Sequence, residues 1–355
     1  MVTETSVEST CRRMREILRD VVPDIELRYK AELVYEINRL KQERHAVILG
    51  HNYMEPALFH TVPDHKGDSL ELARIAASTE AEIIVFCGVR FMAETACILS
   101  PEKTVLLPSD KAGCSLAESI TAADVRALKQ RYPGVPVVTY VNTYADVKAE
   151  SDACCTSSNA ADVVRSFDTD TVIFLPDEFL AGNVAKETGM RIIFPKRVDA
   201  SSSDGLGSNV MVGWEGRCEV HEKFTVQDVR NVRAQFPDVE VLAHPECRPE
   251  VVEVCDFSGS TSAMIRHVKE SNASRYLLLT ECCMGDNIAV ENPDKEMVRL
   301  CSVRCPHMNE ITLEDTLDSL RNTRYVITVP EEIRSRAARA LNRMLEVRPP
   351  IAAAP

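Results

Sequence analysis

The sequence is short of several features, and each shortage excludes a class of protein. Aromatic residues make up only 5% of the 355 residues, with a single tryptophan. No apolar run approaches the roughly 18 residues that cross a bilayer, and the charged amino-terminal stretch lacks the apolar centre of a secretory signal. The formal charge is −13, and no basic stripe offers a surface to nucleic acid. We therefore expect a cytosolic protein that binds neither membranes nor nucleic acid.

Cysteine, by contrast, is abundant. The chain has 13 cysteines, an odd number scattered along the sequence, unlike the disulfide framework of a small secreted domain. Several lie in or beside apolar runs, as Cys87 and Cys97 do. The adjacent pairs Cys154–Cys155 and Cys282–Cys283 have poor geometry for sharing one metal. We interpret most of these cysteines as small buried hydrophobic residues.

An internal repeat organises the chain. Apolar runs at 45–53, 135–143 and 239–247 each end in a short polar cluster. Each is followed by a small-residue turn, a helical stretch, a second strand, a second helical stretch and a third strand, the last at 103–108, 191–195 and 296–301. This β-α-β-α-β order predicts parallel sheets with right-handed crossovers. We therefore predict an α/β fold of three pseudo-symmetric, three-layer αβα domains around a central site.

The repeat also sets the expected boundaries of the domains. We place the segment 312–322 at the end of the third domain, and the segment 325–330 as a possible late strand. The predicted divisions are an N-terminal helical segment at 1–44, α/β domains at 45–120, 121–225 and 226–330, and a C-terminal helix and tail at 331–355.

Reactive side chains stand at the end of the first strand of each repeat. In open α/β sheets, ligands bind at the carboxyl ends of the strands, and three copies of one unit can direct these ends at a shared centre. We therefore predict an active site between the domains. The side chains are His51 and Tyr53 in the first repeat, Tyr140 and Asn142 in the second, and His244 and Glu246 in the third.

The small-residue turns after those strands point to the same centre. They place Ser69, Ser157 with Thr156, and Ser260 with Thr261 at helix N-termini. Free N–H groups and the helix dipole attract anions there, although serine and threonine also cap helices without binding anything. Because the three positions match, we expect both roles, and a substrate with several negative charges.

One cysteine after the third strand of each repeat differs from the buried ones. Cys114, Cys218 and Cys305 lie in loop-like contexts close to glycine or proline. Three thiolates from distant loops fit a [4Fe-4S] cluster with one iron open to substrate, while a zinc site with three cysteine ligands is the competing interpretation. Cys301 is four residues before Cys305 with Ser-Val-Arg between, so it is either a spare thiol or a competitor for Cys305.

Four further histidines carry weaker signals. His221, three residues after Cys218, could support a metal site or be an ordinary surface histidine, and the sequence favours neither. His60, His65 and His307 lie in loop-like segments, where a functional role is less expected than a structural one.

Several segments together resemble the quinolinate synthase family, which serves the aspartate route to NAD. They include GDSLELA, FCGVRFMAETACIL, AGCSLAES, TYVNT, SDACCTSSNA, WEGRCEVHEKF, HPEC, SGSTSAM and CPHMNEITLE. The resemblance implies a central [4Fe-4S] cluster with Cys114, Cys218 and Cys305 as ligands. Some members have a C-x2-C-x2-C run with a redox-active disulfide at the last ligand, and this chain has only Cys301 and Cys305 there. The implied substrate-binding residues are His51, Tyr53, Ser69, Tyr140, Asn142, Ser157, His244, Glu246, Ser260 and Thr261.

The resemblance also implies the reaction. The family's substrates are iminoaspartate and dihydroxyacetone phosphate, and its transferase-type condensation yields quinolinate, phosphate and two waters, with the open iron as the Lewis acid for dehydration. L-aspartate oxidase or aspartate dehydrogenase is the implied source of iminoaspartate. We expect catalysis to involve His51, Tyr53, Tyr140, His244 and Glu246, with His244 and Glu246 as first choices for proton transfer.

Other functions stay open at this point. A hydro-lyase acting on a different carbon skeleton would use the same open iron. Turnover with iminoaspartate and dihydroxyacetone phosphate would distinguish it from a quinolinate synthase. A non-catalytic iron–sulfur sensor would need neither the polar strand ends nor the turns, and no helix-turn-helix with a basic face is evident. A binding protein without catalysis would leave the cysteines unexplained.

Overall fold

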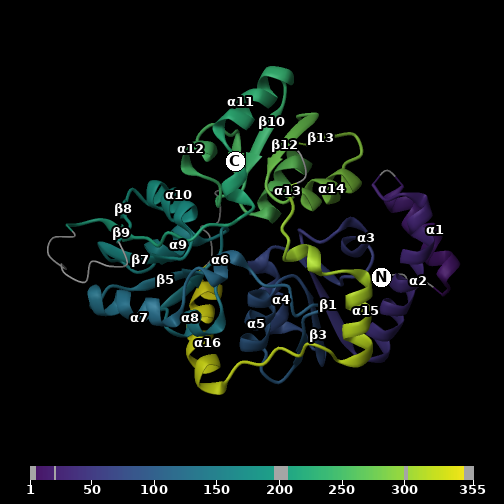
Figure 1. Cartoon of the computed structure of the whole chain (residues 1–355), viewed down its shortest axis with the longest axis horizontal. Helices are drawn as coiled ribbons and strands as arrows, with labels where there is room; N and C mark the ends of the chain where they lie inside the picture. The colour runs from purple at the N-terminus through teal and green to yellow at the C-terminus, as the bar shows by residue number, and fades with distance from the viewer. Residues whose placement is uncertain (1–4, 20, 196–206, 300–302, 348–355) are drawn as a thin grey trace.

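The computed structural model describes residues 5–19, 21–195, 207–299 and 303–347 and shows an α/β fold with three separate parallel sheets (Figure 1). The predicted fold class is therefore confirmed. In Figure 1 the third sheet with its helices lies at the top, the second at the left and the first below and to the right. None of the described helices is long and apolar enough to cross a membrane.

The first sheet is built on a strand that is buried almost throughout. β1 has the sequence AVILGH, and all but its first residue are buried. Such a run suits a parallel strand covered by helices on both faces. The strand order is β2-β1-β3-β4. The strands are β1 (Ala46–His51), β2 (His65–Gly67), β3 (Ile83–Cys87) and β4 (Thr104–Leu106), and the helices are α3 (Pro56–Phe59), α4 (Ser69–Ser78), α5 (Arg90–Leu99) and α6 (Ser115–Glu118).

The second sheet has five strands in the order β6-β5-β7-β9-β8. We expected its third strand at 191–195, but that segment forms the edge strand β8, and β9 lies between it and β7. β9 is fully buried and β8 is not, so the more apolar strand takes the inner position. The elements are α7 (Ala122–Arg131), β5 (Val137–Tyr140), α8 (Ala145–Ala149), β6 (Ala153–Cys155), α9 (Ala160–Arg165), β7 (Thr171–Leu175), α10 (Glu178–Thr188), β8 (Arg191–Ile193) and β9 (Val210–Val212).

The third sheet repeats the order of the first, as β11-β10-β12-β13. Its third strand is confirmed over β13, while residues 300 and 301 of the expected strand lie outside the described residues. Its elements are α11 (Val226–Gln235), β10 (Glu240–Ala243), α12 (Pro249–Val252), β11 (Phe257–Ser258), α13 (Thr261–Glu270), β12 (Arg275–Leu279), α14 (Cys282–Glu291) and β13 (Glu296–Val298), preceded by the 3-10 turn His221–Lys223 and followed by the turn Met308–Glu310.

A common topology underlies the three sheets. In each, the first strand lies between a short edge strand and the second strand. The edge strands β2, β6 and β11 were not predicted, because two or three residues are too few to show a periodic pattern. The first strand of each sheet therefore lies at the point where the order of successive strands across the sheet changes direction. Open α/β sheets bind ligands at such points.

The helices at the two ends of the chain join units that are distant in sequence. α15 packs against α2 and β3, so the segment 312–322 covers the first sheet rather than ending the third unit as expected. α16 packs against α8, β6 and α5 (Figure 1). The segment 325–330 forms one antiparallel bridge, between Leu106 and Val326, and no strand. The bounds are α1 (Val7–Leu18), α2 (Asp24–Glu43), α15 (Leu313–Asn322) and α16 (Glu331–Glu346).

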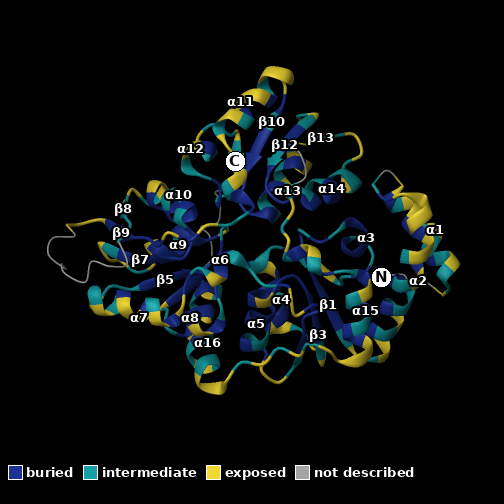
Figure 2. Cartoon of the chain, in the orientation of Figure 1, coloured by how far each residue is buried: buried dark blue, intermediate teal, exposed yellow. Residues whose placement is uncertain are grey.

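Burial follows this layered arrangement. The inner strands are mostly dark blue in Figure 2, and much of the outer faces of the helices is yellow. One apolar cluster runs through the first sheet, part of the second, and the terminal helices, whereas the third sheet has clusters of its own. The first two units therefore share a core, and the domain boundaries given above remain a prediction.

Candidate active site and metal centre

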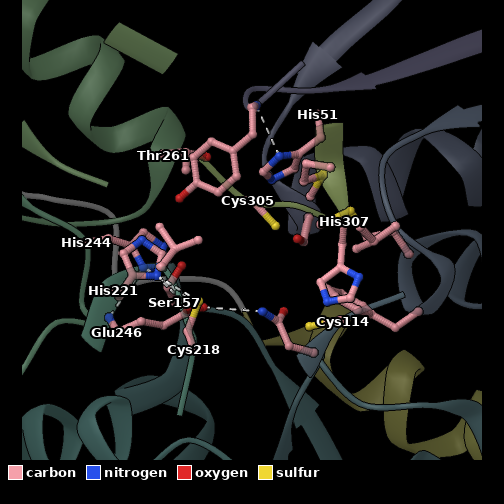
Figure 3. A pocket seen from close by; sticks show the side chains of 18 of the residues that line it. His51, Cys114, Ser157, Cys218, His221, His244, Glu246, Thr261, Cys305 and His307 are labelled. Atoms are coloured by element: carbon pink, nitrogen blue, oxygen red, sulfur yellow. Dashed lines mark hydrogen bonds and ion pairs between the residues drawn. The ribbon is translucent and has the colours of Figure 1, made fainter. Parts of the chain in front are cut away.

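A cavity lies where the carboxyl ends of the first strands of all three sheets meet (Figure 3). It contains side chains from each of the three units, so the predicted strand ends do converge on one centre. Of the residues predicted as substrate or metal ligands, those lining the cavity are His51, Tyr53, Ser69, Cys114, Tyr140, Asn142, Ser157, Cys218, His244, Glu246, Thr261 and Cys305.

Ser260 is the one predicted residue that does not line the cavity. Its hydroxyl caps α13, accepting from the N–H of Ala263 at 3.3 Å, and donates to Asp68 Oδ2 at 3.0 Å. Both partners are internal to the protein, so Ser260 caps a helix as expected, and its role in binding substrate stays a prediction.

Asp68 organises the turns that were expected to bind anions. It is the N-cap of α4, and its Oδ1 accepts from the N–H groups of Leu70 and Glu71 at 3.1 and 3.0 Å. Its Oδ2 accepts from the hydroxyls of Ser158 and Ser260. A carboxylate therefore caps the first turn of α4, and the role of Ser69 as a substrate ligand stays a prediction. The sequence signal was Asp-Ser before a helix.

The end of β1 places two aromatic side chains in contact. The N–H of Tyr53 donates to Nδ1 of His51 at 3.2 Å, and the two rings meet edge to face with centroids 4.7 Å apart. The Tyr53 hydroxyl lies 2.6 Å from Oγ1 of Thr280, which follows β12 of the third sheet. Tyr53 thus reaches from the first unit to the third.

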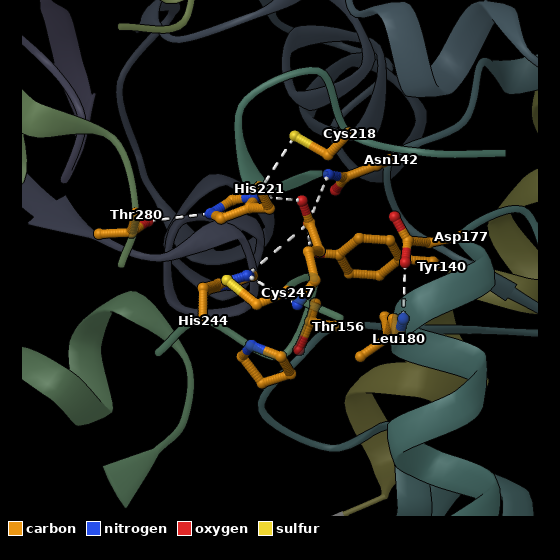
Figure 4. Close-up of polar contacts among 12 residues, drawn as sticks. Tyr140, Asn142, Thr156, Asp177, Leu180, Cys218, His221, His244, Cys247 and Thr280 are labelled. Atoms are coloured by element: carbon orange, nitrogen blue, oxygen red, sulfur yellow. Dashed lines mark hydrogen bonds and ion pairs between the residues drawn. The ribbon is translucent and has the colours of Figure 1, made fainter. Parts of the chain in front are cut away.

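Glu246 is the centre of the polar contacts in the cavity, and its partners Tyr140, Asn142 and His221 are labelled in Figure 4. Its Oε1 accepts from the Tyr140 hydroxyl at 2.5 Å and from the Asn142 amide at 3.3 Å. Its Oε2 lies 2.8 Å from Nδ1 of His221. The strand ends of the second and third sheets are therefore joined through one carboxylate.

Burial and these contacts set the charge states in the cavity. Burial by itself would raise the pKa of Glu246, but the charge and hydrogen bond of His221, with His244 and Tyr140, hold that pKa well below its usual range. Burial lowers the pKa of His51 to about 4 and that of His244 to about 3. Burial, followed by the charge of Glu246, raises the pKa of Tyr53 and Tyr140 well above 10. At neutral pH Glu246 is thus a carboxylate, His51 and His244 are neutral imidazoles, and Tyr53 and Tyr140 are intact phenols.

His221 is a residue whose role the sequence left open. Its side chain is buried, its ring stacks on His244 with centroids 4.7 Å apart, and its Nδ1 lies 3.3 Å from Sγ of Cys218. The surface interpretation is therefore wrong, and the three-residue spacing from Cys218 was the available signal. His307 also lines the cavity, whereas His60 and His65 do not.

The three cysteines predicted as metal ligands lie in the cavity on separate loops. Cys114 precedes α6, Cys218 follows β9, and Cys305 precedes the turn Met308–Glu310. Burial raises the pKa of the Cys114 thiol to about 12 and that of Cys305 to about 11, and it raises the pKa of Cys218 well above its usual value. A bound metal would reverse this, because metal ligands are thiolates.

The spacing of these thiols bears on the kind of metal they could hold. A single tetrahedral zinc ion, with Zn–S bonds of about 2.3 Å, would draw its sulfur ligands to within about 4 Å of one another. In the part of the chain that the structure describes, the three cysteines do not form a group whose ligand atoms all lie within 4.8 Å. The arrangement is therefore compatible with a larger centre such as an iron–sulfur cluster. Cys301 lies outside the described residues, so its relation to Cys305 stays open.

The paired cysteines divide into two cases. Cys154 and Cys155 are fully buried in β6, as expected of structural residues. Cys282 and Cys283 do form a compact group with Glu281, with ligand atoms within 4.8 Å of one another, so their geometry is better suited to a metal than expected. The Glu281 carboxylate already accepts from the N–H of Cys283 at 2.7 Å, which gives the group a structural use.

Comparison with known proteins gives one family. The Quinolinate synthetase A protein family (NadA) matches the chain over residues 35–346. The chain belongs to this family. The quinolinate synthase of Sinorhizobium fredii is 52% identical over 333 residues, which cover 94% of this chain and 87% of the relative. The quinolinate synthase of Caulobacter vibrioides is 49% identical over 348 residues, covering 97% and 89%. Quinolinate synthase 2 of Mesorhizobium japonicum is 50% identical over 343 residues, covering 97% and 100%.

These matches confirm the predicted family and enzyme class. The segments that suggested the quinolinate synthetase A family lie within the matched range. They also supply residues that line the cavity, among them Cys114, Cys218, Glu246 and Cys305. The residues that define the resemblance in sequence are thus the ones that meet in space.

Proposed function

We propose that the chain is a quinolinate synthase that condenses iminoaspartate with dihydroxyacetone phosphate in this cavity, yielding quinolinate, phosphate and two waters. One observation carries the proposal: three cysteines from three separate loops line the same cavity as the reactive ends of the three first strands. Relatives about half identical over nearly the whole chain, each named quinolinate synthase, support it.

We assign Cys114, Cys218 and Cys305 as the ligands of a [4Fe-4S] cluster. When bound, such a cluster with three protein ligands supplies an iron that can act as a Lewis acid for the loss of water. The protein encloses the space around these thiols with Phe91 and Met92, which line the cavity from α5. An apolar wall of this kind limits the access of water to the reacting groups.

Glu246 is the assigned general base. Its carboxylate is ionised and is oriented by Tyr140, Asn142 and His221. Ring formation requires several proton transfers, each needing a positioned acid or base. The neutral rings of His51 and His244 can orient carbonyl or carboxylate groups, and the hydroxyls of Ser157 and Thr261 can hold substrate oxygens.

The substrates also define the expected surroundings of the enzyme. Iminoaspartate would come from L-aspartate oxidase or aspartate dehydrogenase, and the reaction would take place in the cytoplasm. This source of iminoaspartate and this location both follow from the assigned reaction.

The test is to purify the protein without oxygen and to count iron and sulfide per chain. We expect about four irons per chain, the content of one [4Fe-4S] cluster, lost in Cys114→Ala, Cys218→Ala and Cys305→Ala. Cys301→Ala and Cys255→Ala serve as controls that keep the iron. Cys255 suits this purpose because it hydrogen-bonds the backbone of α12, away from the cavity.

An activity assay with the two substrates then tests which reaction the protein catalyses. Quinolinate formed from the two substrates by the iron-loaded protein would support the proposal. Zinc in place of iron, or iron retained without the three thiols, would overturn the ligand assignment. A loaded cluster with no quinolinate would point to another dehydration.

A further inference from the structure

The first turn of α14, in the third unit, gathers three metal-binding side chains that the proposed reaction does not use (Figure 1). Glu281 is the N-cap of this helix, and Cys282 and Cys283 are its first two residues. One carboxylate oxygen of Glu281 and the two Sγ atoms all lie within 4.8 Å of one another. None of the three residues lines the central cavity. They therefore form a separate set, which we call the α14 thiol group.

The spacing of these ligand atoms suits a single metal ion. Zinc, with Zn–S bonds of about 2.3 Å and Zn–O bonds of about 2.1 Å, brings its tetrahedral ligands to within about 4 Å of one another. The α14 thiol group needs only a small contraction to reach that spacing. The three cysteines assigned to the iron–sulfur cluster do not lie this close together as a set. The two sets of thiols therefore differ in the kind of centre that they can hold.

Glu281 uses its two oxygens differently. Its Oε2 accepts from the N–H of Cys283 at 2.7 Å, which caps the helix, whereas its Oε1 lies 3.8 Å from Sγ of Cys282. Glu281 and Cys283 are both buried. The capping bond thus fixes a buried carboxylate with one oxygen directed at a sulfur atom. Ligands that are already ordered in this way lose little further freedom when an ion binds.

A small pocket beside the group gives an ion a way in. This pocket is separate from the central cavity and is lined by Glu281 and Cys282 together with Arg299 and Val303. The Cys282 side chain is partly exposed, while Cys283 lies deeper. The group thus offers three protein ligands and leaves the fourth position of a tetrahedral ion for water from the pocket.

Charge also favours a divalent cation at this place. Two thiolates and one carboxylate carry three negative charges, a divalent ion supplies two positive ones, and the Arg304 guanidinium beside Cys282 supplies a third. The hydrogen bond from Cys283, with that from Arg304, lowers the pKa of the Cys282 thiol against the opposing effect of burial. Because thiolates rather than thiols bind metals, this environment supports the geometry described above.

We propose that the α14 thiol group binds a thiophilic divalent cation of the zinc class, with the two thiolates and one Glu281 oxygen as ligands and water in the fourth position. Binding sends the thiol protons to solvent and changes no oxidation state. The site shares no ligand with the assigned [4Fe-4S] cluster, so the inference does not rest on the proposed function.

The zinc content of the iron-loaded protein tests this site. The protein is purified without oxygen, incubated with Zn²⁺ and passed through gel filtration, and zinc and iron are then counted. We expect about one zinc per chain in addition to the iron, and zinc binding at least tenfold weaker in Cys282→Ala and in Cys283→Ala. Cys255→Ala is the matched control, because Cys255 is a partly buried thiol that bonds the backbone of α12. No retained zinc, or equal affinity in all four proteins, would overturn the proposal.

The neighbours of the bound zinc give a test that needs no variant to fold. Zinc X-ray absorption of the parent protein should show two sulfur neighbours at about 2.3 Å and oxygen in the remaining positions. Any other number of sulfurs would contradict the assigned ligands.

A last control separates this site from the cluster ligands. Zinc should remain in a chain in which Cys114, Cys218 and Cys305 are all replaced by alanine. Its loss there would assign the zinc to those thiols and overturn the proposal. The measurements use zinc content and zinc neighbours alone, so a protein that binds zinc at this site and forms no quinolinate would refute the proposed reaction and leave the zinc site standing.

Discussion

Glu246 shows how a single side chain acquires its chemistry from its neighbours. Burial opposes the ionised form, since a charge without water is costly. The charge and hydrogen bond of His221, the charge of His244 and the hydrogen bond from Tyr140 more than offset that cost and lower the pKa of Glu246. A carboxylate kept ionised and oriented in this way is suited to accept a proton from a substrate.

Replacing Glu246 by glutamine tests that role. Glu246→Gln removes the negative charge and can place an amide N–H opposite the donor on His221. Because the amide cannot accept a proton from a substrate, kcat should fall by about 100-fold or more. Iron per chain should stay the same, because Glu246 is not an assigned ligand. Glu240→Gln is the control, since Glu240 also contacts a histidine, His267, at the far end of the same strand. Parent-like turnover by Glu246→Gln with an intact cluster would remove this residue from the mechanism.

His60 gives the protein a predictable response to acid. Burial, and then the charge of Lys66, lower its pKa from 6.5 to about 4, and its Nε2 has no hydrogen-bond partner among the described residues. The unfolded chain therefore binds the proton more tightly, so the contribution of His60 to stability is complete above about pH 6.5 and is lost as the pH falls towards 4.

The measurement compares unfolding at two pH values. Between pH 7 and pH 5, His60 should account for about 2 kcal/mol of the lost free energy of unfolding. His60→Gln cannot titrate and should lose correspondingly less over that interval in urea titrations. Equal losses in the two proteins would show that His60 is not protonated on unfolding.

At the scale of elements, the N-terminus of α4 connects three turns from three units. Asp68 caps α4 through one oxygen and holds Ser158 and Ser260 through the other. Ser158 lies next to Ser157, and Ser260 next to Thr261, both of which line the cavity. The cap of one helix therefore also fixes the position of two substrate-facing turns.

Asp68→Ala should consequently affect both stability and substrate binding. Loss of the cap should lower the free energy of unfolding by about 1 kcal/mol, and the loosened turns should raise KM several-fold. Thr225→Ala removes a comparable cap from α11, which is on the periphery of the third unit, and should cost similar stability without changing KM. A normal KM in Asp68→Ala would mean that the turns hold their positions without this carboxylate.

At the scale of the whole molecule, α16 holds the first and second units together. Its buried face, with Ala337, Ala340, Leu341 and Met344, packs against α8, β6 and α5. The Met344 carbonyl also accepts from the side chain of Asn159, which precedes α9. The last described helix thus supports the segment that carries Ser157.

Truncating one residue of this face should be costly. Leu341→Ala removes a fully buried side chain and should lower the free energy of unfolding by about 3 kcal/mol. The neighbouring Asn342 is exposed, and Asn342→Ala should leave stability within about 0.5 kcal/mol of the parent. Urea unfolding of the two variants compares them directly, and a small loss in Leu341→Ala would indicate that the helix contributes little to the joint core.

The sequence by itself determined the repeated α/β units, the reactive strand ends and the three loop cysteines. These features are local: an apolar run, the polar residues that end it and the residues in the next turn are all contiguous in the chain. His51, Tyr140 and Glu246 could be named because each directly follows or ends a strand. The placement of Cys114, Cys218 and Cys305 in one cavity followed from the matched positions of the repeats.

Only the tertiary structure decided which distant groups meet. β9 takes an inner position in its sheet because its three residues are all buried, whereas the equally short β8 is more polar, and three residues carry no pattern of their own. α15 covers the first sheet although it follows the third in sequence. Thr280, His221 and Asp68 are single polar residues whose roles depend on partners tens to hundreds of positions away. Hydrogen bonds of that kind leave no periodicity in the sequence, so they become visible only when the chain has folded.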